Sequence, residues 1–301
     1  MSLRISVITC VYNGAAFIDD YWRGIINLGN LVSEIIIVND GSTDATKHKL
    51  DELNDKRLNI VHQNNKGLPA SRNVGLNKTN SDYVIFLDID DSLDSLSLKK
   101  ISELLLKSNF DVVVANVKYV SHMPNKNTNI LNVLRRFALP NETKISKKIY
   151  FNNFLVTPSC LVISSAHAKN NPFRSELTIG EDWEFFTRVL DTSNLLVVKN
   201  TLVNYLIVDG SMSSESLKSS QKVRFLKESL LENYRYNFSS KTSQYSKHIE
   251  VIVALFELKR SNYSVTTSNA FRIHGALFFR SPRSIKYIFV SFFKMVLSKI
   301  L

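Results

Sequence analysis

The chain is poor in cysteine and lacks the glycine-rich signatures of several nucleotide-binding folds. Its two cysteines, Cys10 and Cys160, belong to no Cys-x-x-Cys pair and to no cluster with histidine. This pattern excludes a disulfide framework and a zinc site, and it is typical of a reducing compartment. Neither Gly-x-Gly-x-x-Gly after the first predicted strand nor a P-loop motif occurs. Any diphosphate must therefore be held in another way.

Long apolar runs are also missing. No stretch of about 18 uninterrupted apolar residues occurs, so we expect no segment that spans a bilayer. The N-terminal residues lack a basic stretch followed by an apolar run and a small-residue cleavage site, so we expect no signal peptide. The sequence thus predicts a cytoplasmic protein, with 44% hydrophobic residues available for a packed core.

Acidic residues are scarce in the last third of the chain. Residues 1–213 hold 23 basic and 22 acidic residues, whereas residues 214–301 hold 15 and 5, so nearly all of the net charge of +11 is C-terminal. Such a region attracts nucleic acid, anionic lipid headgroups or diphosphate-bearing substrates, unless it is only a solvated lysine-rich surface. No recognisable RNA- or DNA-binding module is present, so nucleic acid is not an expected partner.

The pattern of apolar residues predicts an α/β fold. Predicted strands alternate with predicted helices, and the strands are almost continuously apolar, which is typical of a mainly parallel sheet covered by helices on both faces. The predicted strands are residues 4–10, 34–38, 58–62, 83–87, 111–120, 161–164 and 195–207, and the predicted helices are 15–28, 44–54, 68–77, 96–107 and 180–189. We expect Ser42 or Thr43 to cap the second helix.

Polar residues follow several of these strands, where parallel sheets bind their ligands. The most acidic of these strand ends is Asp88–Asp91. In an extended segment Asp88 and Asp90 would point the same way, about 6 to 7 Å apart. A divalent cation would relieve their repulsion. The alternative is a plain strand end, with Asp91 in a turn and Asp94 or Ser95 capping the next helix.

Five stretches carry a resemblance to a known family. SVITCVYNG, IIIVNDGSTDAT, NNKGLPASRNVGL, YVIFLDIDD and GEDWEFFTRVL follow one another in the order and spacing of the family 2 glycosyltransferases, whose fold is called GT-A. The resemblance covers about residues 3–213. It implies a nucleotide-sugar donor, and it assigns the second acidic residue of the motif Asp-x-Asp to a metal ion.

The resemblance implies roles for single residues. Tyr12, Asn13 and Asp40 would bind the donor nucleotide, with Asp40 accepting a hydrogen bond from the nucleobase. Arg72 would reach the nucleotide from its helix, while Asn73 and Gly75 keep that helix close to the sheet. From the residues alone, Asp40 could equally be a turn residue and Arg72 a surface ion pair.

The same resemblance places the chemistry on two further carboxylate pairs. Asp90 would ligate Mn²⁺ or Mg²⁺, and Asp88 would contact the ribose or a metal-bound water. Asp182 would be the general base, with Glu181 as the alternative base or a ligand of the acceptor. Acidic residues in a first helical turn could instead only complement the helix dipole.

The sequence departs from the family at three positions. Ile89 replaces a small residue, and Leu206 and Val208 replace the Arg and His often found in the loop over the diphosphate. The residues that could substitute there are Ser211, Ser213, Lys218 and Lys222.

Residues 214–301 are predicted to form a basic helical appendage. Helical spacing occurs in residues 221–236, 245–260 and 284–301, and the last of these is almost entirely apolar apart from a narrow polar stripe. We expect it to lie on an anionic membrane at the inner face of the plasma membrane. The alternative is a helix packed on its own domain.

Residues 121–150 are polar and basic, and are read as an acceptor-facing insertion or a loop without chemistry.

Together these features predict two regions, a GT-A glycosyltransferase domain (1–213) and the basic C-terminal region (214–301). The expected enzyme is a metal-dependent, inverting glycosyltransferase of surface polysaccharide biosynthesis. It would move a sugar from a UDP-sugar to a lipid-linked saccharide. The alternatives are a nucleotidyltransferase-like enzyme and a non-catalytic saccharide-binding or scaffold subunit.

Overall fold

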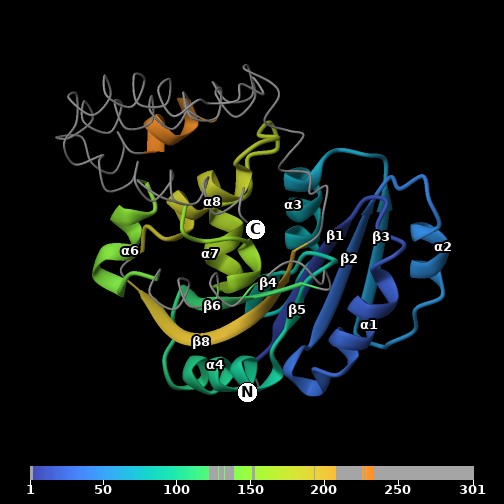
Figure 1. Ribbon diagram of the computed structural model, residues 1–301, viewed down its shortest axis with the longest axis horizontal. Helices are drawn as coiled ribbons and strands as arrows, with labels where there is room; N and C mark the ends of the chain where they lie inside the picture. The colour runs from blue at the N-terminus through green and yellow to red at the C-terminus, as the bar shows by residue number, and fades with distance from the viewer. Residues whose placement is uncertain are drawn as a thin grey trace.

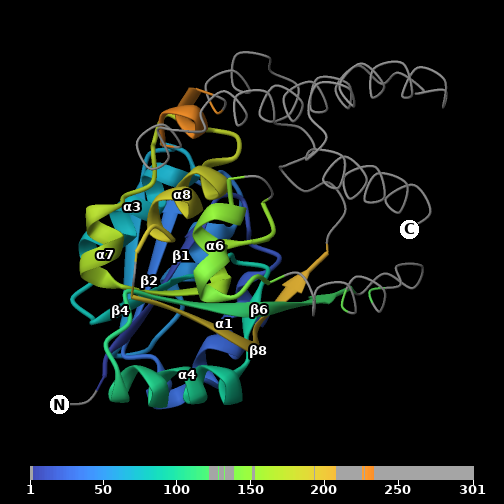
Figure 2. The same cartoon turned by 90° about the vertical axis from the view of Figure 1, so that its left-hand side faces the viewer.

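The computed structural model describes residues 3–121, 128, 132, 139–150, 153–192, 194–207, 226 and 228–233. These residues form one central sheet with helices on both faces (Figures 1 and 2). The strands are β1 Ile5–Val11, β2 Glu34–Asp40, β3 Leu58–Gln63, β4 Tyr83–Phe86, β5 Ser92–Leu93, β6 Val112–Val120, β7 Leu161–Ser164 and β8 Leu195–Leu206. The helices are α1 Ile18–Ile26, α2 Thr46–Asp51, α3 Leu68–Lys78, α4 Ser95–Lys107, α6 Glu142–Lys148, α7 Ser165–Asn170 and α8 Glu181–Val189, with short 3₁₀ turns at Gly29–Leu31 and Pro158–Cys160.

The eight strands lie in the order β3-β2-β1-β4-β7-β6-β8-β5. The first four are parallel to one another, and β7 runs antiparallel to both β4 and β6. The chain builds outward from β1 through β2 to β3 and then returns to the other side of β1 as β4. Strand order therefore reverses beside β1, and the loops after β1 and β4 flank the crevice where such sheets bind ligands.

Apolar strands explain why the sheet is buried on both sides. Residues Ile35–Val38 of β2 and Val84–Phe86 of β4 are at most 1% exposed. Figure 2 shows α3, α6, α7 and α8 on one face of the sheet and α4 on the other. Helix α3 lies unusually close, since a Cβ added to Gly75 would come within 2.4 Å of the Ile8 side chain. The expectation that Gly75 keeps this helix near the sheet is confirmed, whereas the Asn73 side chain bonds the backbone of Phe173 and not the sheet.

The sequence predicted most of this architecture. The mainly parallel sheet with flanking helices is confirmed, and β7 has the predicted bounds. Asp94 caps α4, as one alternative held, because its carboxylate accepts a hydrogen bond from the amide of Ser97 at 2.8 Å. The predicted cap of α2 was wrong: the helix begins after Ala45, and Ser42 instead accepts a hydrogen bond from the Asn13 amide.

Three short elements were not predicted, namely β5, α6 and α7. Helix α6 falls within the stretch 121–150, which the sequence presented as a polar insertion. Its Ile145 and the following Ile149 and Tyr150 are almost completely buried, so this end of the stretch belongs to the core. Its few apolar residues are too widely spaced to predict that packing from sequence alone.

Helical residues Leu226 and 228–233 fall within the predicted helix 221–236, and we call them the C-terminal segment. The helices predicted at 245–260 and 284–301, together with Ser211, Ser213, Lys218 and Lys222, lie outside the described residues. Within the part of the chain that the structure covers, no helix combines the length and the apolar character needed to cross a membrane.

Candidate active site

The loops after β1 and β2 are tied to each other at the sheet edge. The Asn13 side chain accepts hydrogen bonds from the backbone amide and the hydroxyl of Thr43 at 2.8 and 3.3 Å. Asn13 has a φ of +52°, a left-handed conformation that asparagine adopts more readily than most residues. Tyr12 beside it is 50% exposed. Asn13 thus fixes the rim of the crevice and leaves the Tyr12 ring open to a ligand.

Asp40 ends β2 and organises the loop after β3. It is 3% exposed, and its carboxylate accepts hydrogen bonds from the amides of Lys66 and Gly67, both at 2.8 Å, and from the Gln63 side chain at 2.7 Å. A carboxylate offers about four acceptor positions, so about one remains. Asp40 therefore belongs to a fixed loop rather than to a free turn.

Arg72 joins two carboxylates that are distant in sequence. Its guanidinium donates to Asp182 at 2.5 Å and to Asp88 at 2.9 Å, and its side chain is only 3% exposed. The guanidinium carbon also lies 5.1 Å from the centre of the Phe173 ring. A surface ion pair, the alternative considered for Arg72, is excluded by this burial. The structure instead brings Asp88 and Asp182 to opposite sides of one cation.

Asp88 is held in place by two residues that no sequence motif marks. The Thr157 hydroxyl donates to its carboxylate at 3.0 Å, and Ser159 accepts a hydrogen bond from its backbone amide at 3.4 Å. These two residues come from a Thr-Pro-Ser-Cys stretch about 70 residues later. No motif marks that stretch, and only the antiparallel pairing of β7 with β4 brings it to this edge.

The aspartates after β4 lie in a turn, not in an extended segment. Strand β4 ends at Phe86, and the amide of Asp91 donates to the carbonyl of Asp88 at 3.1 Å. The predicted alternation of Asp88 and Asp90 along a strand was therefore wrong, because the backbone turns between them. The turn also brings Asp91 close to Asp88 and Asp90. The sequence placed Asp91 in a turn but indicated no role for it in the site.

The three carboxylates after β4 influence one another. Burial raises the pKa of Asp90, and the Asp88 charge adds to this shift. Burial raises the pKa of Asp91 to about 9, again with Asp88 and Asp90 adding to it. One Asp91 oxygen accepts the Leu206 amide at 3.1 Å, while the other is buried without a hydrogen-bond partner.

This group fits a divalent cation in its chemistry. Carboxylate oxygens are the ligands that Mg²⁺ and Mn²⁺ prefer, and a nearby cation would oppose the burial and the mutual repulsion that raise the pKa values of Asp90 and Asp91. Among the described residues, however, no three or more acidic, histidine or cysteine side chains are already grouped as a metal site. Asp88 and Asp90 could therefore provide part of a coordination shell, to be completed by a ligand.

The first turn of α8 carries the second pair of acidic residues. Burial raises the pKa of Asp182 to about 7. The Arg72 guanidinium opposes this shift, and the Glu181 and Asp88 charges add to it. The Asp182 side chain still keeps 26% of its exposure. A partly accessible carboxylate with a pKa near neutrality is suited to exchange a proton with a bound hydroxyl group.

The end of β8 lies beside the aspartates that follow β4. The Leu206 amide bonds Asp91, and burial together with the three aspartate charges raises the pKa of the Tyr205 hydroxyl. Position 206 therefore contributes through its backbone, although its side chain departs from the family pattern. Tyr205 is a further residue near the aspartates that sequence reasoning did not select.

Comparison with known proteins gives consistent results. Residues 6–170 match the family model described as glycosyl transferase family 2. The chain is 26% identical to the cholesterol galactosyltransferase of Borreliella burgdorferi, over 97% of this chain and 74% of that protein. It is 23% identical to the Escherichia coli UDP-Glc:alpha-D-GlcNAc-diphosphoundecaprenol beta-1,3-glucosyltransferase WfgD, over 71% of this chain and 81% of that protein.

A solved structure shares the fold. The crystal structure of Staphylococcus aureus TarS 1–349 in complex with UDP-GlcNAc superimposes with a TM-score of 0.67 at 19% sequence identity, covering 90% of this chain and 76% of that one. The mixed sheet with its flanking helices is thus the GT-A arrangement that the motifs predicted.

Proposed function

The chain belongs to glycosyltransferase family 2, and from this premise we propose that it transfers a sugar from a UDP-sugar to a hydroxyl group of a lipid-linked saccharide, with inversion at the anomeric carbon. Two comparisons support the donor and acceptor classes. TarS was crystallised with UDP-GlcNAc, and WfgD is named as a glucosyltransferase that uses UDP-Glc and acts on a sugar linked to diphosphoundecaprenol. Family membership favours glycosyl transfer over the nucleotidyltransferase and scaffold alternatives.

One observation carries this proposal, namely the bridge that Arg72 makes between Asp88 and Asp182. Asp88 belongs to the aspartate turn at the switch point of the sheet, where a nucleotide diphosphate would lie. Asp182 belongs to α8, on the other side of the crevice. A donor bound against Asp88 would therefore present its sugar toward Asp182, with the Arg72 guanidinium between the two carboxylates.

The donor would be held by the loops after β1 and β2. We assign the nucleobase to the exposed ring of Tyr12 and to the remaining acceptor position of Asp40. Asn13 shapes this rim through its hydrogen bonds to Thr43. Arg72 would reach the nucleotide when its ion pairs rearrange on binding.

Asp90 and Asp88 would hold a divalent ion, Mn²⁺ or Mg²⁺. When bound, such an ion supplies positive charge against the negative charge that develops on the departing nucleoside diphosphate. Asp91 stays behind these two residues, where it fixes the end of β8 through the Leu206 amide. The carboxylates of this turn repel one another, and a cation would relieve that repulsion. This property of the chain favours a metal-dependent enzyme.

Asp182 would act as the general base. Its carboxylate takes the proton of the acceptor hydroxyl as that oxygen attacks the anomeric carbon from the face opposite the leaving group. Arg72 favours the ionised form of Asp182, and the raised pKa of the carboxyl gives it the basicity to accept a proton near pH 7. Glu181 precedes it and would bind the acceptor.

We further propose that residues 1–213 form the catalytic domain of an enzyme in surface polysaccharide assembly. The C-terminal region would then hold it on the inner face of the plasma membrane. The charge of residues 214–301 supports this proposal, since a lipid-linked acceptor lies at an anionic surface.

The test uses the full chain and a panel of UDP-glucose, UDP-galactose and UDP-N-acetylglucosamine. UDP release is measured with and without Mn²⁺, and UDP binding is measured by calorimetry. We expect turnover of one donor, and we expect Asp182→Asn to lower it by about 10² to 10⁴ while UDP still binds. Asp191→Asn, just after the same helix, is the matched control and should retain turnover. Normal turnover by Asp182→Asn would require another base, and absence of UDP binding by the wild type would refute the donor class.

A further inference from the structure

Helix α8 carries a second buried carboxylate on the side away from the base. Glu184 follows Asp182 by two residues, which is about 200° around a helix, so the two side chains leave it in nearly opposite directions. Glu184 is fully buried. Arg188 donates to both of its oxygens at 2.8 Å, and Arg174 lies 3.1 Å from it. None of these residues enters the mechanism proposed above.

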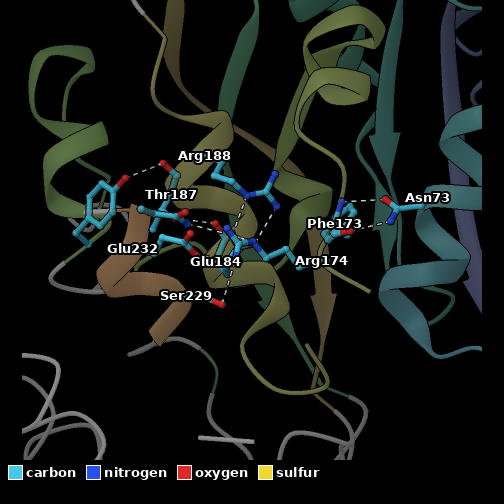
Figure 3. A network of polar contacts seen from close by, with 10 residues as sticks. Asn73, Phe173, Arg174, Glu184, Thr187, Arg188, Ser229 and Glu232 are labelled. Carbon is cyan, nitrogen blue, oxygen red and sulfur yellow. Dashed lines mark hydrogen bonds and ion pairs between the residues drawn. The ribbon is translucent and has the colours of Figure 1, made fainter. Parts of the chain in front are cut away.

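The C-terminal segment completes the shell around Glu184. Asn233 donates to Glu184 and to the Thr187 hydroxyl, both at 3.0 Å. Arg174 donates to Glu232 at 3.2 Å and to Ser229 at 3.3 Å. Figure 3 shows this network, with Arg174 and Arg188 beside Glu184 and the C-terminal segment alongside. Removing one partner of a buried charge leaves it uncompensated, so the network resists rearrangement.

The same segment also packs against the start of α8. Leu226 and Leu230 are 3% and 1% exposed, so both belong to the core. A Cβ added to Gly180 would lie 2.4 Å from the Leu226 side chain. Gly180 caps α8 and directly precedes Glu181 and Asp182. The C-terminal segment therefore contacts α8 just before the proposed base and again in its last turn.

A continuous path leads from this segment to Arg72. Arg174 follows Phe173, whose backbone amide and carbonyl are bound by the Asn73 side chain at 2.8 and 2.7 Å. The Phe173 ring stacks on Phe185 of α8 at 3.9 Å and lies under the Arg72 guanidinium. Residues 173 and 174 thus connect α3, which carries Arg72, with both α8 and the C-terminal segment.

We propose that the C-terminal segment positions the general base, with Arg174 as the positioning residue that links the segment to α8. Leu226 on Gly180, together with Asn233 and Arg174 on Glu184, sets where α8 places Asp182 relative to Arg72. This proposal rests on the proposed role of Asp182. It makes a part of the C-terminal region necessary for the transfer step.

Donor binding should depend much less on the segment. Tyr12 and Asn13 lie in the loop after β1 and Asp40 ends β2, and the hydrogen bonds of Asn13 and Asp40 run to the loops after β2 and β3 and to Gln63 of β3. Loss of the segment's contacts should therefore lower kcat and leave the affinity for UDP unchanged. A residue that is only structural would instead lower stability, UDP affinity and turnover together.

The chain offers a direct reporter of α8. It has two tryptophans, Trp22 and Trp183, and Trp183 lies next to the base, 5% exposed, with its indole N–H donating to the Ile149 carbonyl at 2.6 Å. In a Trp22→Phe background, Trp183 fluorescence and its quenching by acrylamide report the position of the helix. Neither signal requires a sugar donor.

The test compares two buried leucines. Leu226→Ala removes the contact with Gly180, and Leu105→Ala removes a leucine that is 1% exposed in α4, on the opposite face of the sheet. Both should lower the melting temperature. Only Leu226→Ala should shift Trp183 emission to the red, lower kcat for UDP release by at least about tenfold, and move the acid limb of the pH–rate profile. The Kd for UDP should stay within about twofold of the wild type.

A second variant keeps the leucine core intact. Arg174→Met should reproduce the effects of Leu226→Ala, and Arg174→Lys should restore part of the turnover because it keeps the charge. If Leu226→Ala and Arg174→Met retain the kcat and acid limb of the Leu105→Ala control, the proposal is overturned. It is equally overturned if UDP affinity falls in parallel with kcat.

Failure of the base assignment would look different. If Asp182→Asn retains turnover while Leu226→Ala loses it, Asp182 is not the base, but the segment still positions α8. If Asp182→Asn is inactive and Leu226→Ala behaves like its control, the base assignment stands and the role of the segment is refuted.

Discussion

Replacing Arg72 with methionine should move the acid limb of the pH–rate profile to higher pH. Asp182 must be ionised to accept a proton, so the rate rises with pH through its pKa, which is about 7 in the presence of Arg72. The guanidinium lies 2.5 Å from the carboxylate and stabilises the ionised form. Its removal therefore raises the pKa of Asp182, and a higher pH is needed for the same rate.

The size of the shift follows from the geometry. Two charges about 4 Å apart interact by about 4 kcal/mol at an effective dielectric constant of about 20, which equals about three pKa units. The Asp182 side chain keeps 26% of its exposure, so water screens part of this interaction. We therefore expect a shift of about one to two units. A shift of one unit lowers the ionised fraction at pH 7 from about a half to about a tenth, a loss of about fivefold in rate.

The assay is kcat/KM for UDP release between pH 5.5 and 9.5, since this constant reports ionisation in the free enzyme. Any loss of donor contacts by Arg72→Met lowers the whole curve without moving its acid limb. Arg57→Met is the matched control, because Arg57 also forms a largely buried ion pair, with Asp55 at 2.9 Å, but at the opposite edge of the sheet. An acid limb of Arg72→Met at the wild-type position would refute the coupling of Arg72 to the base.

Three further predictions concern the metal, the fold and the membrane. Asp90→Ala should abolish Mn²⁺-dependent UDP release and Mn²⁺ binding in calorimetry, and full activity would remove its role as a ligand. Gly75→Ala should destabilise the fold by about 1 to 3 kcal/mol in urea unfolding, because the new methyl group meets Ile8 at 2.4 Å. Gly24→Ala in α1, with its nearest neighbour 4.0 Å away, should instead be neutral or stabilise by up to about 1 kcal/mol; equal stability of both variants would contradict the argument. Truncation after Ser281 removes four basic residues and should release the protein from anionic vesicles in flotation, whereas unchanged binding would contradict the membrane role.

The sequence by itself determined the main sheet and the residues at its edge. Continuous apolar runs can be buried only between two layers, so they predicted β1 to β4 and their helices. Since parallel strands end at one edge, the polar residues after them were expected to meet, and Asn13, Asp40 and Asp88 do lie there. Periodicity was enough for this result because it depends only on local geometry and burial.

The tertiary structure decided what each of these residues contacts. Nothing in the sequence shows that Arg72 joins Asp88 to Asp182, because the second carboxylate lies 110 residues away. Thr157 and Ser159 likewise reach Asp88 only through the pairing of β7 with β4. The turn at Asp88–Asp91 depends on where β4 ends, a boundary that apolar patterning leaves uncertain by a few residues.

The C-terminal segment shows the same division. Its helical spacing and the basic charge of the surrounding region 214–301 were visible in the sequence, and they indicated an appendage. Its packing of Leu226 on Gly180 and of Asn233 on Glu184 was not visible, because contact between distant segments depends on the shape of the folded core and not on either segment alone. Sequence thus determined the main strands and helices and the edge where ligand-binding groups collect, while the tertiary structure decided that Arg72 faces the base and that the C-terminal segment holds its helix in place.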